Sequence, residues 1–229
     1  MNIIYLLFHG LSPYSGISKK ILYQVKGLEA CGHQVSLCTY CIADNSHRVR
    51  MINGEIIADY GTGKLAAARK RVSYQCIYHY AVAHRVELIY VRSFHNANPF
   101  TIRLFSKLRK AGIKIAMEIP TYPYDNEYAG FPLATRLGIQ VDKVFRKTLS
   151  EHVNAIVTFS DHHHIFGQRT IQISNGVDFD SIPLKKTVFK NTSVIHLLGV
   201  AEVHYWHGYD RLIAVSYTHL RAHETDSYL

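Results

Sequence analysis

The fold of this chain is decided near its N-terminus, where residues 2–39 read NIIYLLFHGLSPYSGISKKILYQVKGLEACGHQVSLCT. Asn2–Phe8 is an uninterrupted apolar run, which is typical of a strand covered on both faces. After a loop rich in Gly, Ser and Pro, Ile17–Cys31 places apolar residues at helical spacing, and Gly32 predicts the end of that helix. Gln34–Thr39 alternates as a second strand. The stretch therefore predicts a strand–helix–strand unit.

The same alternation of strand and helix continues along the chain. Three further apolar runs predict strands at Leu88–Val91, Lys114–Glu118 and Ala155–Phe159, and two stretches between them predict helices at Pro99–Lys110 and Ala134–Ser150. Strands that alternate with helices form a parallel sheet with right-handed crossovers. We therefore expect an α/β fold, a Rossmann-like doubly wound parallel sheet, whose ligands bind outside the carboxyl ends of the strands.

Two segments before the third of these strands depart from the alternation. Val49–Tyr60 predicts a hairpin that turns at Asn53 and Gly54, a pair that favours a type I′ turn. Lys64–Ala83 predicts one basic amphipathic helix, with a run of cations around Lys70 and apolar side chains on the other face. Such a run is most often an ordinary solvated face, although an anionic lipid surface would also fit it.

Composition limits the class of protein. The 229 residues carry 26 Lys and Arg against 17 Asp and Glu, a formal net charge of +9, and 48% of them are apolar. These values exclude a disordered chain, and 14 Gly, 6 Pro and 4 Cys exclude collagen-like and disulfide-stapled classes. The apolar run Ile3–Phe8 is too short to span a membrane and lacks the features of a signal peptide. We therefore expect a cytoplasmic location, with the inner face of the membrane as a peripheral alternative.

Two clusters of potential metal ligands favour ordinary packing over chemistry. Cys38 and Cys41 form a close pair, but zinc would need two more ligands at suitable spacing, and free Cys is usually buried. His162, His163 and His164 are consecutive, so their side chains point in different directions, and a solvated loop is the favoured interpretation. Neither a metal nor another cofactor is expected.

The C-terminal part of the chain changes character. A polar and basic stretch, 181–192, predicts a linker out of an N-terminal domain that spans 1–180. Residues 193–214 predict the first strand and turn of a second domain, with a helix that begins at Tyr209 or Asp210 and ends at Ala214. Residues 215–229 dilute the helical pattern and resemble translated sequencing-adapter read-through, so we expect them to be non-native.

Two loops at the carboxyl ends of predicted strands hold candidate site residues. The first places Ser15 and Gly16 at the start of a helix, where backbone N–H groups and the helix dipole bind anions; a plain tight turn is the alternative. The dinucleotide fingerprint of nicotinamide enzymes is absent from this loop. The second loop runs from Glu118 to Asp125 and contains Tyr122 between two prolines. A carboxylate beside aromatic side chains suits a general base or carbohydrate binding, and a rigid proline turn with surface tyrosines is the alternative.

Three parts of the chain carry a family resemblance. Ile3–Thr39 has a Gly loop and a helix that ends in Leu28–Val35 (LEACGHQV); Asn154–Ser160 is followed by Ile173–Asp178, which reads ISNGVD; and Gly199–Ile213 reads GVAEVHYWHGYDRLI. Together they resemble the retaining glycosyltransferases of family 4, particularly members that build capsule and exopolysaccharide. That family has the GT-B fold, in which two Rossmann-like domains face each other.

The resemblance implies that a sugar passes from a nucleotide-sugar donor to an acceptor hydroxyl, with retention of configuration and without a metal. The N-terminal domain would bind a glycan or lipid-linked acceptor in surface polysaccharide or glycolipid synthesis. Ser15, Gly16 and Tyr122 would form the acceptor and phosphate loop, and Gly16 would lie near the donor phosphates. Glu118 would be the catalytic residue near the reacting centre.

On the donor side, the resemblance places His207 and Gly208 in the phosphate-binding turn of the second domain. Glu202 and His207 stand where much of the family has an Arg and a Lys, and the paired-glutamate motif that grips the donor is missing. We therefore expect this chain to be inactive by itself.

Two other classes of function stay open. A non-catalytic basic Rossmann-like module would bind a membrane or nucleic acid, but no recognised nucleic-acid-binding motif is present, so nucleic acid is not the expected partner. A different Rossmann-like enzyme would use a dinucleotide.

Overall fold

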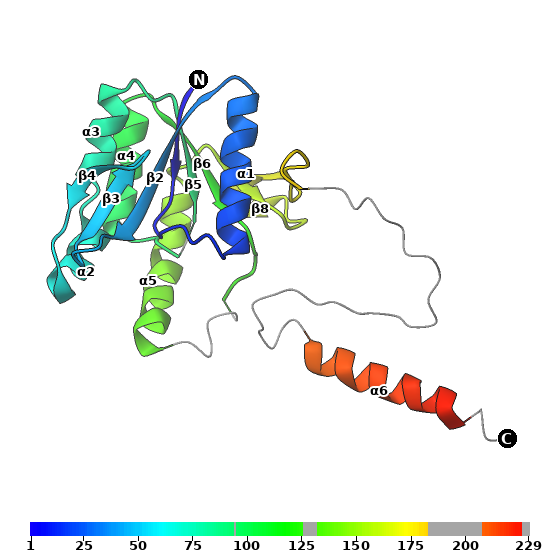
Figure 1. The fold of residues 1–229 in the computed structure, drawn as a ribbon. Coiled ribbons are helices and arrows are strands. Elements are labelled where there is room, and N and C mark those ends of the chain that lie inside the picture. The colour runs from blue at the N-terminus through cyan, green and yellow to red at the C-terminus, as the bar shows by residue number, and fades with distance from the viewer. Residues whose placement is uncertain (94, 126–131, 183–207, 226–229) are drawn as a thin grey trace. The chain divides into compact units, whose positions relative to one another are not determined.

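The computed structural model describes residues 1–93, 95–125, 132–182 and 208–225 (Figure 1). The chain divides into two units, Met1–Ile182 and Pro183–Leu229. The described residues of the first unit form one nine-stranded sheet with helices between its strands. No helix in the described part of the chain is long and apolar enough to cross a membrane.

The sheet is open and mostly parallel. Its strands lie in the order β4-β3-β2-β1-β5-β6-β7-β9-β8, with the bounds β1 (Asn2–Leu6), β2 (Gln34–Ile42), β3 (Arg48–Ile52), β4 (Glu55–Asp59), β5 (Leu88–Arg92), β6 (Lys114–Ile119), β7 (Ala155–Thr158), β8 (His164–Ile165) and β9 (Gln168–Gln172). The strands from β2 to β9 in this order are parallel, and β3, β4 and β8 add antiparallel pairs at the two edges. The predicted α/β class is confirmed, and the arrangement is compatible with a Rossmann-like fold.

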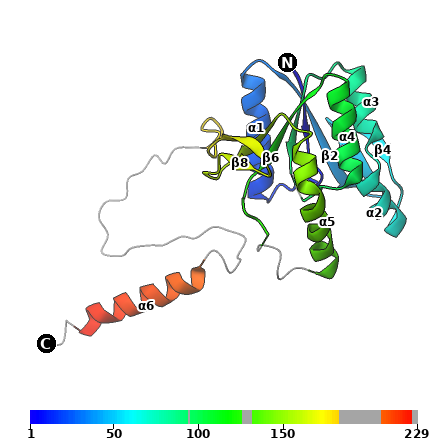
Figure 2. The same cartoon turned by 180° about the vertical axis from the view of Figure 1, so that it is seen from behind.

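Helices cover both faces of this sheet. α1 (Gly16–Ala30) packs on one face, where Ile21 contacts a small cluster built on Tyr5 and Leu7. Figure 2 shows α3 (Gln75–Ala83), α4 (Pro99–Lys110) and α5 (Leu133–Ser150) on the opposite face, which holds the larger core with Ile4 and Leu6. Successive side chains of β1 pack alternately into the two cores, because neighbouring residues of a strand point to opposite faces of the sheet.

Several predicted elements are confirmed closely. α4 has the predicted bounds, Pro99–Lys110, and Asn98 caps it by accepting hydrogen bonds from the N–H groups of Phe100 and Thr101. The hairpin β3–β4 turns at Asn53 and Gly54, whose φ angles of 50° and 89° are the positive values that a type I′ turn needs.

The prediction of one helix over Lys64–Ala83 is wrong. The segment forms α2 (Gly63–Val72) and α3, and Ser73 between them is extended, with φ −106° and ψ 104°. The break turns Tyr74 into the core, where it is 6% exposed, and the Ser73 carbonyl accepts a hydrogen bond from the Tyr60 hydroxyl at 3.1 Å. Burial of this aromatic ring therefore outweighs helix continuity.

The C-terminal elements also differ from the predictions. His164 opens β8 and β9 follows it, so the solvated loop predicted around the three histidines ends at a short hairpin. In the second unit, α6 (Tyr209–Thr225) continues beyond Ala214, where the predicted helix ends. The strand predicted at the start of 193–214 lies outside the described residues.

Candidate functional site

A cleft of about 570 Å³ lies at the carboxyl edge of the sheet, beside the start of α1. The cleft is lined by residues at the carboxyl ends of β1, β5 and β6, by the N-terminal part of α1 and by one residue after β9; among them are Gly10, Gly16, Lys20, Arg92, Thr121 and Asn175. The chain connections diverge on either side of β1 and β5, and in open α/β sheets this switch point is where ligands bind. The cleft is therefore in the position that the sequence predicts for a site.

The N-terminus of α1 forms one wall of the cleft. The Ser15 hydroxyl caps the helix by accepting a hydrogen bond from the Ser18 N–H at 3.4 Å, and the Ser18 hydroxyl accepts one from the Ser12 N–H at 2.9 Å. The first turn of α1 contains no acidic residue, so its side chains do not neutralise the positive end of the helix dipole. Ser15 and Gly16, the residues that the sequence proposed, both line the cleft.

Two glycines of this wall are present for different reasons. A Cβ atom on Gly10 would lie 2.9 Å from the backbone oxygen of Tyr40, so the loop can approach β2 this closely only with glycine. A Cβ atom on Gly16 would meet no heavy atom within 4 Å. Packing explains Gly10 but not Gly16, whose open side borders the cleft.

Glu118 is not one of the residues that line the cleft, but it contacts two of them, Lys20 and Arg92. Its side chain is fully buried. The carboxylate accepts hydrogen bonds from the Tyr90 hydroxyl at 2.7 Å and from the Gln24 amide at 2.9 Å, and it forms an ion pair with Arg92. The Lys20 ammonium is 3.9 Å from the same carboxylate. Glu118 thus gathers a cation from β5 and a cation from α1.

The cluster around Glu118 carries more positive than negative charge. Lys20 and Arg92 both line the cleft and share this one carboxylate. The Lys20 ammonium also lies 3.3 Å from the centroid of the Phe159 ring. Burial lowers the pKa of Lys20 to about 8; Glu118 opposes this shift and Arg92 adds to it. Together with the N-terminus of α1, these cations favour an anionic group in the cleft.

Two tyrosines, the buried Tyr5 and the half-buried Tyr90, support the same cluster. The Tyr5 hydroxyl donates to the Gln24 side-chain oxygen at 2.6 Å, and the Gln24 amide in turn donates to Glu118. Burial, together with the Glu118 charge, raises the pKa of both Tyr5 and Tyr90, so both phenols remain protonated donors. The carboxylate is therefore held in one orientation by a chain of hydrogen bonds.

A second polar cluster borders the cleft. His95 and Tyr124 line it with ring centroids 4.4 Å apart. The Tyr124 hydroxyl donates to the carboxylate of Asp142 at 2.7 Å, and the Ala97 N–H donates to the other oxygen at 3.0 Å. Asp142 comes from α5 and is buried. Burial lowers the pKa of His95, although Asp142 opposes this shift, so His95 is neutral at pH 7.

The sequence did not point to His95 or Asp142, and it included Tyr124 only as part of the loop from Glu118 to Asp125. His95 was detectable in principle, since it follows the strand Leu88–Val91 at the edge where ligands bind. The pairing of Tyr124 with Asp142 joins a loop to a helix across the amino-acid sequence, and no local pattern signals it.

The other predicted site residues lie elsewhere. The Tyr122 ring makes edge contacts with His162 at 4.9 Å and Phe166 at 5.5 Å, and Tyr122 does not line the cleft. Tyr124, and not Tyr122, is the tyrosine of this loop that lines the cleft. Gly208 precedes α6 in the second unit, and His207 lies outside the described residues.

The potential metal ligands do not assemble into a metal site. Within the described residues, no three His, Cys, Asp or Glu side chains come together to hold a metal ion. All the cysteines are free thiols; Cys38 is buried, and burial raises its pKa to about 11, whereas Cys41 is half-buried. The thiol of Cys38 therefore stays protonated at neutral pH.

Comparisons with protein-family models, with curated proteins and with solved structures found no match for this chain.

Proposed function

We propose that this chain provides the acceptor-binding part of a retaining nucleotide-sugar glycosyltransferase with a GT-B architecture, of the kind that builds capsule or exopolysaccharide. The observation that carries the proposal is the cleft at the switch point of the sheet, with the N-terminus of α1 and the cations of Lys20 and Arg92 on its walls. A phosphate of the donor or of a lipid-linked acceptor matches this charge, and the resemblance in the sequence supports the transfer of a sugar.

The proposed roles follow from where each side chain lies. The first turn of α1 contacts the phosphate, and the absence of a side chain at Gly16 leaves space for it. Arg92 and Lys20 stabilise negative charge from the walls of the cleft. Hydroxyl and amide groups of Ser12, Thr121 and Asn175 offer hydrogen bonds to sugar hydroxyls.

In this proposal Glu118 acts as a positioning residue. Its carboxylate is buried and already engaged with Arg92, Tyr90 and Gln24, so it holds the cation of Arg92 in place instead of removing a proton from the acceptor. The catalytic role that the sequence suggests for Glu118 is therefore replaced by an indirect one.

The test is a calorimetric titration of the chain with inorganic pyrophosphate and with uridine diphosphate glucose. Gly16→Val adds a branched side chain at the cleft, where its Cβ atom would meet no heavy atom within 4 Å, and we expect affinity about tenfold weaker or worse. Gly27→Val is the matched control, because Gly27 is also in α1 and a Cβ atom there would meet nothing within 4 Å. If Gly16→Val binds both ligands as tightly as the wild type does, the cleft is not their binding site and the proposal loses its main support.

The same titration separates the alternative functions. A basic module would bind DNA or anionic vesicles with a steep salt dependence and ignore both phosphate ligands. That result, with no heat from pyrophosphate or the nucleotide sugar, would replace the glycosyltransferase proposal.

A further inference from the structure

α5 carries an apolar stripe on its outer side. Leu133, Leu137, Val141 and Val144 are between 45% and 71% exposed. Their spacing of four, four and three residues places them on one face of the helix. A surface helix of a globular protein normally presents polar side chains there, so this stripe needs an explanation.

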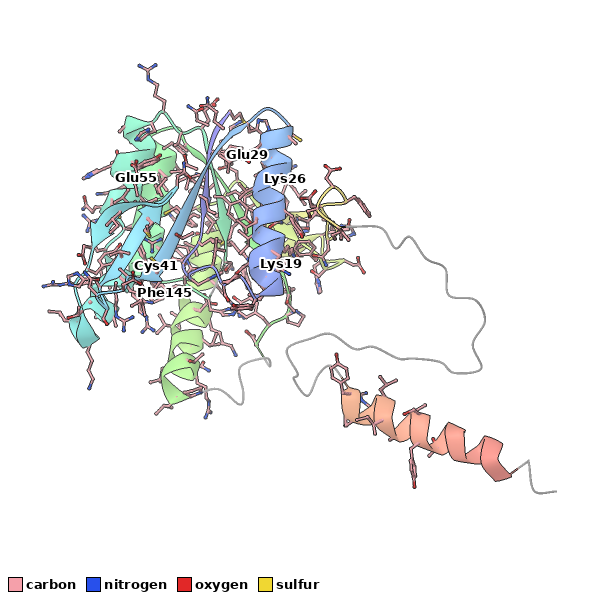
Figure 3. All side chains as sticks on the ribbon, viewed as in Figure 1. Lys19, Lys26, Glu29, Cys41, Glu55 and Phe145 are labelled. Carbon is pink, nitrogen blue, oxygen red and sulfur yellow. The ribbon has the colours of Figure 1, made fainter. Side chains whose placement is uncertain are left out.

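The stripe is separate from the face by which α5 joins the core. Ile139, Asp142 and Leu149 are buried. Phe145, which Figure 3 labels, packs against the larger core. These residues already anchor the helix to the rest of the unit. The exposed leucines and valines are therefore not needed for docking α5.

The charged residues of α5 are mostly cationic. The helix contains four cations and one acid, and the acid, Asp142, is buried. Lys143 and Arg146 pair with Asp125, whereas Arg136 and Lys147 are exposed beside the stripe. The exposed surface of α5 thus combines apolar side chains with positive charge, which is the pattern of helices that lie in a bilayer interface.

The position of α5 makes the stripe accessible. Figures 1 and 2 both show its N-terminal half extending beyond the sheet, on the side where α2 lies. α2 also exposes cations, Lys64, Arg69 and Arg71, together with the apolar side chains of Leu65 and Val72. Both helices therefore present exposed cations and exposed apolar side chains on this side of the unit.

We propose that the apolar stripe of α5 binds the surface of an anionic lipid bilayer. Leu133, Leu137, Val141 and Val144 enter the interface, and Arg136 and Lys147 contact lipid phosphates. The charge selects this occupant, since a second copy of the chain would bring the same cations to the interface. The inference does not depend on the proposed sugar transfer.

The experiment is co-sedimentation of the whole chain with vesicles of phosphatidylglycerol and phosphatidylcholine in equal parts, and with vesicles of phosphatidylcholine alone. We expect binding to the first and little to the second. Leu137→Gln combined with Val144→Gln should weaken binding by at least about tenfold, because two exposed side chains no longer enter the apolar layer. Circular dichroism confirms that the variant remains folded.

The control variant is Ile56→Gln, which changes a side chain of β4 that is as exposed as Leu137. Its binding should equal that of the wild type. The inference is overturned if the chain does not sediment with anionic vesicles, or if the stripe variant binds like the control. It is also overturned if the stripe variant changes the oligomeric state in analytical ultracentrifugation without lipid, because a second copy would then be the occupant. Pyrophosphate affinity, measured in parallel, should not change, which keeps this test distinct from that of the cleft.

Discussion

The two buried carboxylates near the cleft, Glu118 and Asp142, are stabilised in different ways. Glu118 pairs with Arg92, lies near Lys20 and accepts two further hydrogen bonds from neutral side chains. The described hydrogen bonds of Asp142 come from neutral donors, the Tyr124 hydroxyl and the Ala97 N–H. The comparison teaches that Glu118 holds two cations at the cleft, whereas Asp142 fixes the loop after β5 and the side chain of Tyr124.

The largest effect should come from neutralising Glu118. Glu118→Gln leaves Arg92 and Lys20 without their shared counterion, and we expect the free energy of unfolding to fall by about 3–5 kcal/mol. Urea denaturation of Glu118→Gln, of Arg92→Met and of the two combined measures the coupling between the two residues. If the double variant is no more stable than Glu118→Gln, the interpretation of Glu118 as a counterion is wrong.

A smaller loss should follow from Asp142→Asn. The amide oxygen can still accept one of the two hydrogen bonds, so we expect a loss of about 1–3 kcal/mol in the same denaturation experiment. A loss equal to that of Glu118→Gln would show that Asp142 also compensates a buried charge, and the contrast between the two carboxylates would then disappear.

The two tyrosines sharpen the contrast further. Each donates to its carboxylate at 2.7 Å, Tyr90 to Glu118 and Tyr124 to Asp142. Removal of the hydroxyl in Tyr124→Phe should lower stability by about 1–2 kcal/mol. Tyr90→Phe should lower it by less, because Glu118 retains its cations and Gln24. Equal losses by thermal or urea unfolding would contradict this order.

The last effect is the pH dependence that Lys20 confers. Its pKa is lowered from 10.5 to about 8, so the folded chain releases this proton at a lower pH than the unfolded chain does. The contribution of Lys20 to stability is therefore lowest below pH 8 and rises between pH 8 and 10.5. Pyrophosphate affinity should move the opposite way and fall roughly tenfold over that range, because the cation is lost. Lys20→Met should remove the pH dependence of both the stability and the pyrophosphate affinity in this range. If either pH dependence persists in the variant, another group is responsible for it.

The elements of the sheet were largely predictable because their periodicity is local. Asn2–Phe8, Ile17–Cys31 and Pro99–Lys110 each contain their own pattern and boundary signals, and β1, α1 and α4 form there. The break between α2 and α3 was not predictable in this way, because it depends on the burial of Tyr74 against distant residues.

The site was predictable in position more than in chemistry. The loop at Ser15 and Gly16 was identifiable from the alternation of strand and helix. The partners of Glu118 were not, because Arg92 lies on another strand and Lys20 on a helix. Only the assembled sheet brings the three side chains together.

The ion pair between Arg92 and Glu118 also bears on how the sheet forms. The two residues are directly opposite in the parallel register of β5 and β6. A shift of one residue between these strands would turn one charge to the opposite face, into the apolar core formed by Val91 and Met117. An unpaired charge there is far more costly than a misplaced apolar side chain. The pair that positions a cation for the cleft therefore also discriminates against misaligned strands while the chain folds.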